Sequence, residues 1–336
     1  MPSADGPGLP GRRLRICLEL TVLLAAAAWL GLSLGSTEGG PGAVWQVLSG
    51  GLPADSVLPT IILQIRLPRV VLAAVVGATL ALGGLVFQVL LRNPLAEPYM
   101  LGVSGGSAIG AIAAMLAGLA PFPGVALSAF GGSMLTLALL LVLAAGRTRV
   151  NRDSLLLGGV MINAFCGALI MFLISLSRDS EMRHILFWLM GDLSLFRNEQ
   201  LPLLLAVVPS MVLILVLARP LNLLLLGREE AAAMGVSVTL VTTLLLVATT
   251  FMVSLVVCYS GLIGFVGLVI PHILRLLLGV DHRLLAPATL LGGAIYLILC
   301  DLLARTLQQS GELPVGIITA LIGAPLFIFL LWRSRR

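Results

Sequence analysis

The fold is decided by residues 66–106, RLPRVVLAAVVGATLALGGLVFQVLLRNPLAEPYMLGVSGG. Two arginines, Arg66 and Arg69, precede a long apolar run, and the polar sequence from Arg92 to Pro94 ends it. A helix from Arg66 to Asn93 would be about 40 Å long, at roughly 1.5 Å per residue. A bilayer with its headgroups is about 40–45 Å thick. This stretch therefore predicts one helix that carries a polar site to each face of a membrane.

The rest of the chain has the same apolar character. Of its 336 residues, 59% are apolar and 10% are charged, with a mean hydropathy of +1.11. Most segments are apolar on all sides, as helices in lipid are. The apolar runs are continuous rather than alternating, which excludes a transmembrane β-barrel. We therefore expect an all-α, polytopic membrane protein, with residues 1–336 forming a single transmembrane domain.

Spans of about 20 residues leave room for roughly ten transmembrane helices. The first predicted span has two interpretations, a cleaved signal peptide or a retained helix. Glu19 interrupts the apolar region and no clear small-residue cleavage site follows, which favours the retained helix. The predicted spans are 16–35, 63–91, 101–118, 126–145, 155–176, 201–219, 238–258, 264–279, 286–303 and 314–332.

The arginine distribution predicts the orientation of the chain. With the N-terminus inside, 14 of the 20 basic residues lie on the inner face and six on the outer face. The opposite orientation would invert this ratio, against the positive-inside rule. We therefore expect cytoplasmic termini, an even number of spans, and a cytoplasmic tail at residues 1–15.

Several function classes are excluded by residues that the chain lacks or scatters. All 20 basic residues are Arg, so there is no Walker A lysine, and the chain does not hydrolyse ATP by that route. The four cysteines form no CxxC and the three histidines no HExxH, so we expect no disulfide framework, metal site or bound cofactor. The basic pI, about 9.6, follows from the positive-inside bias and does not require nucleic acid as a partner.

A positive patch is predicted on the outer surface. Arg66 and Arg69 are three residues apart and share one helical face, and Pro68 suits a helix start. Arg305 follows the ninth span and would join them. The alternative is that these arginines extend to lipid headgroups. A short surface helix is also predicted on the outer side within residues 177–200.

A docking element is predicted on the cytoplasmic side, in the connection between the sixth and seventh spans. It is short, charged and bounded by glycines, with small residues that would fit a partner's groove. The alternative is an ordinary amphipathic linker. Within residues 220–236 the candidates are Gly227, Arg228, Glu229, Glu230, Ala231, Ala232 and Gly235.

A gate is predicted at the inner face. Asn93 and Leu95 lie where the chain breaks after the second span, and Leu157 opens the fifth span at the same face. A ring of leucines can narrow a central path, although an ordinary helix turn explains the same residues. Asn163, in the fifth span, would either line a polar path or bond a neighbouring helix.

Two further patterns predict contacts inside the membrane. Asp301 lies four residues before Arg305, which favours a local ion pair over a proton relay. Gly102, Gly106 and Gly110 recur every four residues, which is typical of a close helix contact.

Several long motifs in this chain together resemble the FecCD family, the membrane permeases of binding-protein-dependent ABC importers for cobalamin, haem and ferric siderophores. The resemblance covers nearly the whole chain from about residue 16. The motifs that carry it are RLPR (66–69), NPLAEP (93–98), GLIGFVGLVIPHILR (261–275), DHR (281–283) and GELPVGIITALIGAPLFIFLL (311–331).

The resemblance implies a translocation subunit in the bacterial inner membrane. It implies a second permease subunit in a homodimer, two cytoplasmic ATPase subunits that use ATP and Mg²⁺, and a periplasmic binding protein. The implied cargo is a metal chelate, with a ferric siderophore placed first and haem or cobalamin next.

The resemblance also implies roles for the candidate residues. Residues 220–236 match the helices that dock onto the ATPase. Where some cobalamin permeases carry small hydroxyl residues before Leu157, this chain has Arg152 and Asp153, which leaves the gating detail open and slightly disfavours cobalamin. The implied binding-protein contacts are Arg66, Arg69 and Arg305, and the implied gate is Asn93, Leu95 and Leu157.

Two other classes of function are weighed against a permease. An ion-coupled secondary transporter would act without an ATPase, but the chain has few intramembrane acids and a docking element in the cytoplasm. An intramembrane enzyme would need a catalytic constellation such as paired His and Glu on facing spans, and none is visible in the sequence.

Overall fold

The computed structural model describes residues 9–35, 40–51, 56–145, 152–308 and 311–334, and the regular structure in these ranges is helical. The elements are α1 (Leu9–Ser33), α2 (Pro41–Ser49), α3 (Leu58–Thr60), η1 (Ile61–Arg66), α4 (Leu67–Leu90), η2 (Pro98–Leu101), α5 (Val103–Leu116), η3 (Pro121–Val125), α6 (Ala126–Ala145), α7 (Arg152–Leu176), α8 (Asp179–Met190), η4 (Asn198–Val207), α9 (Val208–Val216), α10 (Ala218–Leu226), α11 (Arg228–Ala233), α12 (Val238–Ser260), α13 (Val266–Leu278), α14 (His282–Thr306) and α15 (Val315–Ser334).

All ten predicted spans coincide with apolar helical segments. Seven of these segments are long and apolar enough to cross a membrane, and three shorter ones cover residues 103–116, 266–278 and 315–330. The polytopic all-α prediction is therefore confirmed. The first helix begins earlier than predicted, since α1 starts at Leu9 and residues 9–15 of the predicted tail are helical.

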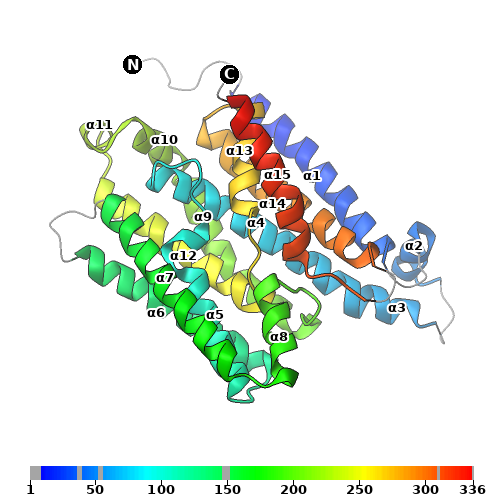
Figure 1. The fold of residues 1–336 in the computed structure, drawn as a ribbon. Coiled ribbons are helices and arrows are strands. Elements are labelled where there is room, and N and C mark those ends of the chain that lie inside the picture. Colours follow the sequence, from blue (N-terminus) through cyan, green and yellow to red (C-terminus); the bar gives the residue numbers. More distant parts are fainter. Residues whose placement is uncertain (1–8, 36–39, 52–55, 146–151, 309–310, 335–336) are drawn as a thin grey trace.

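The two ends of the molecule differ in the elements that they carry (Figure 1). The start of α1 and the end of α15 lie at the same end as α10 and α11, while α2, α3 and α8 lie at the opposite end. This arrangement agrees with an even number of crossings. The short surface helix predicted within residues 177–200 is α8.

The core is built around α4. This helix packs against α12, α13 and α14, and 19 of its 24 residues are buried. Gly77 meets the backbone of Gly293 in α14, and Gly84 meets the backbone of Gly267 in α13. A side chain at either position would strike a carbonyl, so glycine is what allows these helices to cross so closely.

The predicted glycine face of residues 102–110 is confirmed in part. Gly106 lies against Gly132, and Gly110 lies against the carbonyl of Ser128, so both pack α5 onto α6. Gly102 has a different role, because it begins α5 with φ +83°, which an L side chain rarely adopts.

The connection between α12 and α13 is held by the segment that follows α4. The Ile263 amide donates to the Tyr99 hydroxyl at 3.1 Å, and the Phe265 amide donates to Glu97 Oε1 at 3.2 Å. Phe265 itself has φ +68°, an uncommon value for a residue other than glycine. The two segments therefore fix each other.

Candidate functional site

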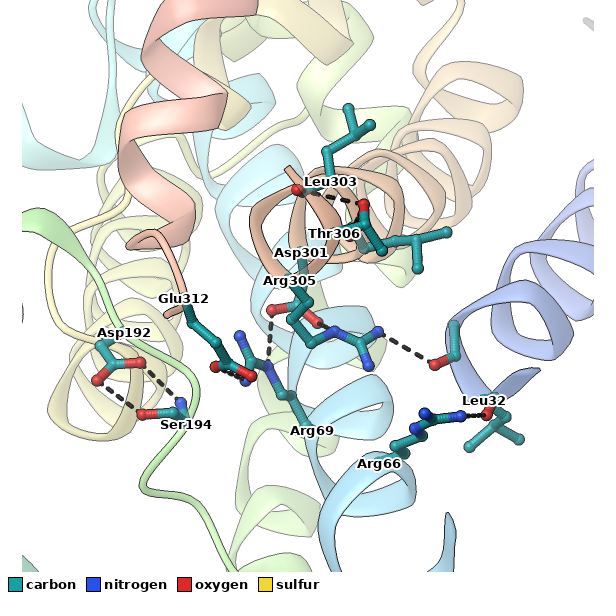
Figure 2. A network of polar contacts seen from close by, with 12 residues as sticks. Leu32, Arg66, Arg69, Asp192, Ser194, Asp301, Leu303, Arg305, Thr306 and Glu312 are labelled. Atoms are coloured by element: carbon teal, nitrogen blue, oxygen red, sulfur yellow. Dashed lines mark hydrogen bonds and ion pairs between the residues drawn. The ribbon is translucent and has the colours of Figure 1, made fainter. Parts of the chain in front are cut away.

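A buried charge network lies where the start of α4 and the end of α14 meet, at the end of the molecule that is predicted to face outward and is called the outer end below (Figure 2). Arg69 Nε donates to Asp301 Oδ1 at 2.8 Å, and Arg69 Nη1 also donates to the Glu312 carboxylate. Arg305 Nε lies 3.0 Å from Asp301 Oδ2, as an ion pair without good hydrogen-bond alignment. Asp301 is 1% exposed, so one buried carboxylate faces two guanidinium groups.

The end of α1 supplies further acceptors to the same region. Arg66 Nη1 donates to the carbonyl oxygens of Leu32 and Ser33 at 2.9 and 3.3 Å, and Arg305 Nη2 donates to that of Gly31 at 3.1 Å. The last carbonyls of a helix have no partner within it, and positive charge is favourable there. The arginines therefore bind the C-terminal end of α1.

The prediction of an exposed positive patch is wrong for these arginines. Arg66, Arg69 and Arg305 are only 4%, 5% and 4% exposed, because carboxylates and helix-end carbonyls surround their guanidinium groups. The local pair between Asp301 and Arg305 is confirmed. The role of the arginines as binding-protein contacts stays a prediction.

The predicted docking segment forms two short helices, α10 and α11, and the face of α11 that points away from the protein is exposed. In α11, Ala231 is buried, whereas Glu229, Glu230 and Ala232 are exposed, as is Gly235 after it. Gly227 separates the two helices with φ +158°, and the Glu230 carboxylate fills the place where a side chain would stand. Arg228 is half-buried at the start of α11.

Contacts that the sequence did not predict fasten α10 to the rest of the protein. Arg92, just after α4, donates from Nη2 to the carbonyl of Leu224 at 3.1 Å. Asn222 Nδ2 donates to Asp281 Oδ1 at 2.7 Å, and the His282 amide donates to Asn222 Oδ1 at 2.8 Å. The only sequence signal was an Asn within an apolar helix and the polar segment 281–283 between two spans.

Asp281 also caps α14. Its Oδ1 accepts from the Arg283 amide at 3.0 Å, and its Oδ2 forms an ion pair with Arg283 Nη2 at 3.0 Å. Burial acts to raise the pKa of Asp281, but hydrogen bonds from Arg283 and Asn222 outweigh it and lower the pKa to about 2. The carboxylate therefore stays charged near neutral pH.

The predicted gate residues have unequal surroundings. Asn93 Oδ1 accepts from the Leu95 amide at 2.9 Å, so this side chain closes the turn after α4. Leu95 and Leu157 are exposed. Their role as a gate stays a prediction. The side chains of Arg152 and Asp153 lie outside the described residues.

Asn163 bonds a neighbouring segment. Its Nδ2 donates to the carbonyl oxygens of Tyr99 and Met100 at 3.1 and 3.2 Å, which joins α7 to η2. Of the two alternatives for this residue, the structure therefore supports the packing contact. Elsewhere α7 is open, since only 11% of its apolar span is buried within this chain.

Comparison with known proteins connects this arrangement to transport. The FecCD transport family matches residues 23–333. The vitamin B12 import system permease protein BtuC of Salmonella typhi is 42% identical over 327 residues, covering 97% of each chain, and that of Salmonella arizonae is 42% identical over 97% of this chain and 96% of its own.

A solved structure has the same fold. A protein described as a metal-chelate type ABC transporter, in an inward-facing conformation, matches with a TM-score of 0.84 and 35% identity, covering 95% of this chain and 99% of its own. The match extends over nearly the full length of both chains, and the relatives above are non-catalytic transport permeases. This chain therefore belongs to the FecCD transport family and is a multi-pass permease subunit of an ABC importer.

Proposed function

We propose that this chain is the translocation subunit of a cobalamin importer in the bacterial inner membrane. The observation that carries the proposal is 42% identity to vitamin B12 permeases over 97% of each chain. This identity places cobalamin first among the candidate cargoes, whereas the sequence analysis placed ferric siderophores before cobalamin. The chain itself performs no covalent chemistry, and a separate ATPase subunit supplies the energy from ATP and Mg²⁺.

The cargo is tested by reconstitution. The permease, its ATPase and its binding protein are placed in liposomes, and ATP-dependent uptake of cyanocobalamin is compared with that of a ferric siderophore. We expect cyanocobalamin to accumulate only when ATP and the ATPase are present. Accumulation of the siderophore alone would reject the cobalamin proposal, and uptake without the ATPase would support a secondary transporter instead.

We propose that the exposed face of α7 meets a second copy of this chain. Phe165 and Met161 are 69% and 61% exposed there, and Leu157 is on the same helix. A cysteine in place of Phe165 should crosslink two copies of the chain. A cysteine in place of Leu18 serves as the control and should not, because Leu18 is 63% exposed on α1, and α1 lies across the molecule from α7 (Figure 1).

We propose that α10 and α11 dock onto the ATPase. The support is the exposed acidic face of α11, bounded by Gly227 and Gly235. A cysteine in place of Glu229 should crosslink to the ATPase in the assembled complex. Failure of crosslinking at this and neighbouring exposed positions would reject the docking role.

The binding protein is proposed to dock by carboxylates at the outer end. Glu312 accepts from Arg69 Nη1 and its side chain is 38% exposed, so a partner carboxylate would compete with Glu312 for Arg69. Glu312→Gln should therefore tighten the complex with the binding protein, because it weakens the competing internal contact. Unchanged affinity would show that Arg69 is not the contact.

A further inference from the structure

The segment 281–283 has no role in the functions described above, although it holds an unusual set of contacts. Asn222, on the docking helix α10, bonds both residues at the start of α14. Its Nδ2 donates to Asp281 Oδ1 at 2.7 Å, and its Oδ1 lies 2.8 Å from the His282 amide and 2.7 Å from His282 Nδ1. We call Asn222, Asp281 and His282 the α10–α14 joint.

The contacts of the joint fix the orientation of the Asn222 side-chain amide and the tautomer of His282. A carboxylate only accepts and a backbone amide only donates, so Asn222 must present Nδ2 to Asp281 and Oδ1 to His282. The same oxygen then requires the proton of His282 on Nδ1. His282 is 1% exposed and Asn222 and Asp281 are half-buried, so the bonds of the joint lie at the edge of the protein interior and hold α10 against α14.

The segment after α4 and the start of α14 both contact α10. Arg92, after the inner end of α4, donates to the Leu224 carbonyl at 3.1 Å, and the α10–α14 joint lies at the first residues of α14. From there α14 continues for 25 residues to the outer end, where Asp301 and Arg305 join the buried charge network. A displacement of α10 would therefore pull directly on α14, which reaches the outer end.

We propose that Asn222 is a positioning residue that transmits movement of the ATPase-docking helices to α14, and through α14 to the outer charge network. The inference rests on the proposed function, because it requires an ATPase that moves α10 and α11. It assigns the transmission to one side chain rather than to the docking surface as a whole. Substitution of Asn222 should leave ATPase binding intact and reduce the response at the outer end.

The test measures the outer end of α14 directly and needs no cargo. The permease–ATPase complex in nanodiscs carries an environment-sensitive fluorophore on Leu307→Cys, where Leu307 is 62% exposed just after α14. The four native cysteines are replaced first. The fluorescence change on addition of ATP with vanadate is then compared between the chain with Asn222 and its variants.

Three variants separate transmission from packing. Asn222→Ala removes all the bonds of the joint, and Asn222→Asp keeps the size but sets a carboxylate against Asp281. Asp281→Asn keeps an acceptor for Asn222 and removes the charge. The matched control is Asn198→Ala, since Asn198 Nδ2 also bonds another element, the carbonyl of Leu63 at 3.0 Å, but at the outer side.

We expect both Asn222 variants to reduce the nucleotide response roughly two- to thirtyfold, the range seen for residues that carry coupling. Asp281→Asn and Asn198→Ala should retain it, and ATP hydrolysis should continue in every complex. A response in Asn222→Ala and Asn222→Asp equal to that of the control would overturn the inference, as would loss of ATPase binding in both. A chain with Asn222 that binds no ATPase would instead overturn the proposed function.

Discussion

The substitution Asp301→Asn should destabilise the protein because it removes the buried negative charge from a group of two arginines and two carboxylates. Two arginines, Arg69 and Arg305, face two carboxylates, Asp301 and Glu312. The amide has nearly the size of the carboxylate, so packing is preserved while the group gains a net positive charge. Asp301 is 1% exposed, so water cannot compensate for the change.

The magnitude follows from the partners that are left. Removing one member of a buried ion pair typically costs about 3–5 kcal/mol. The lower end applies here, because Arg69 keeps Glu312 and Arg305 keeps the Gly31 carbonyl. With an unfolding entropy of roughly 2.1 cal/mol/K per residue, about 3 kcal/mol corresponds to a decrease in Tm of about 4 °C for a chain of this length. Helices that persist in detergent lower this entropy and enlarge the shift.

The assay is thermal unfolding in detergent, followed by near-UV circular dichroism. Glu312→Gln makes the same chemical change at a side chain that is 38% exposed, so its effect should stay below about 1 kcal/mol. The double variant Asp301→Asn with Arg305→Gln restores the charge balance and should recover part of the loss. A Tm for Asp301→Asn within 1 °C of the original chain would refute the reasoning.

Three other predictions follow from contacts described above. Gly84→Ala should cost about 1–3 kcal/mol or prevent folding, because the new methyl group meets the backbone of Gly267, whereas Gly131→Ala, in open space, should be neutral in the same unfolding assay. Asp281 has a pKa of about 2 against an ordinary value of 3.8, so it should stabilise the folded protein above about pH 4 and lose this effect as the pH falls through 2. The difference in Tm between the original chain and Asp281→Asn should therefore vanish near pH 2. Asn163→Ala removes two hydrogen bonds to η2 and should lower the unfolding free energy by about 1–2 kcal/mol, and an unchanged value would contradict the packing role.

The sequence predicted the helices well because lipid imposes a strong and local requirement. A span must be apolar over its whole length, so the ten segments could be located without knowing their neighbours. Glycine spacing likewise predicted the contact of Gly106 and Gly110 with α6, since a close crossing needs small residues on one face.

Exposure was not predictable in the same way, because it depends on residues far apart in the chain. Arg69 and Asp301 are separated by 232 positions, so spacing could not show that a buried carboxylate faces the arginine. The contact of Asn222 with Asp281 and His282 was missed for the same reason. Local spacing succeeded only where the partner lay four residues away, as for Asp301 with Arg305.

The close crossing of α4 and α14 at Gly77 and Gly293 provides a pivot about which the two helices can tilt relative to each other. From this fulcrum, Asp301 lies about 12 Å along α14 and His282 about 16 Å in the other direction, at roughly 1.5 Å per residue. Any tilt about the crossing moves the two ends of α14 in opposite directions, and the excursions are similar because the crossing lies near the middle of this 25-residue helix. The bond between Arg69 and Asp301 joins the outer parts of α4 and α14, so it must break before these parts can separate.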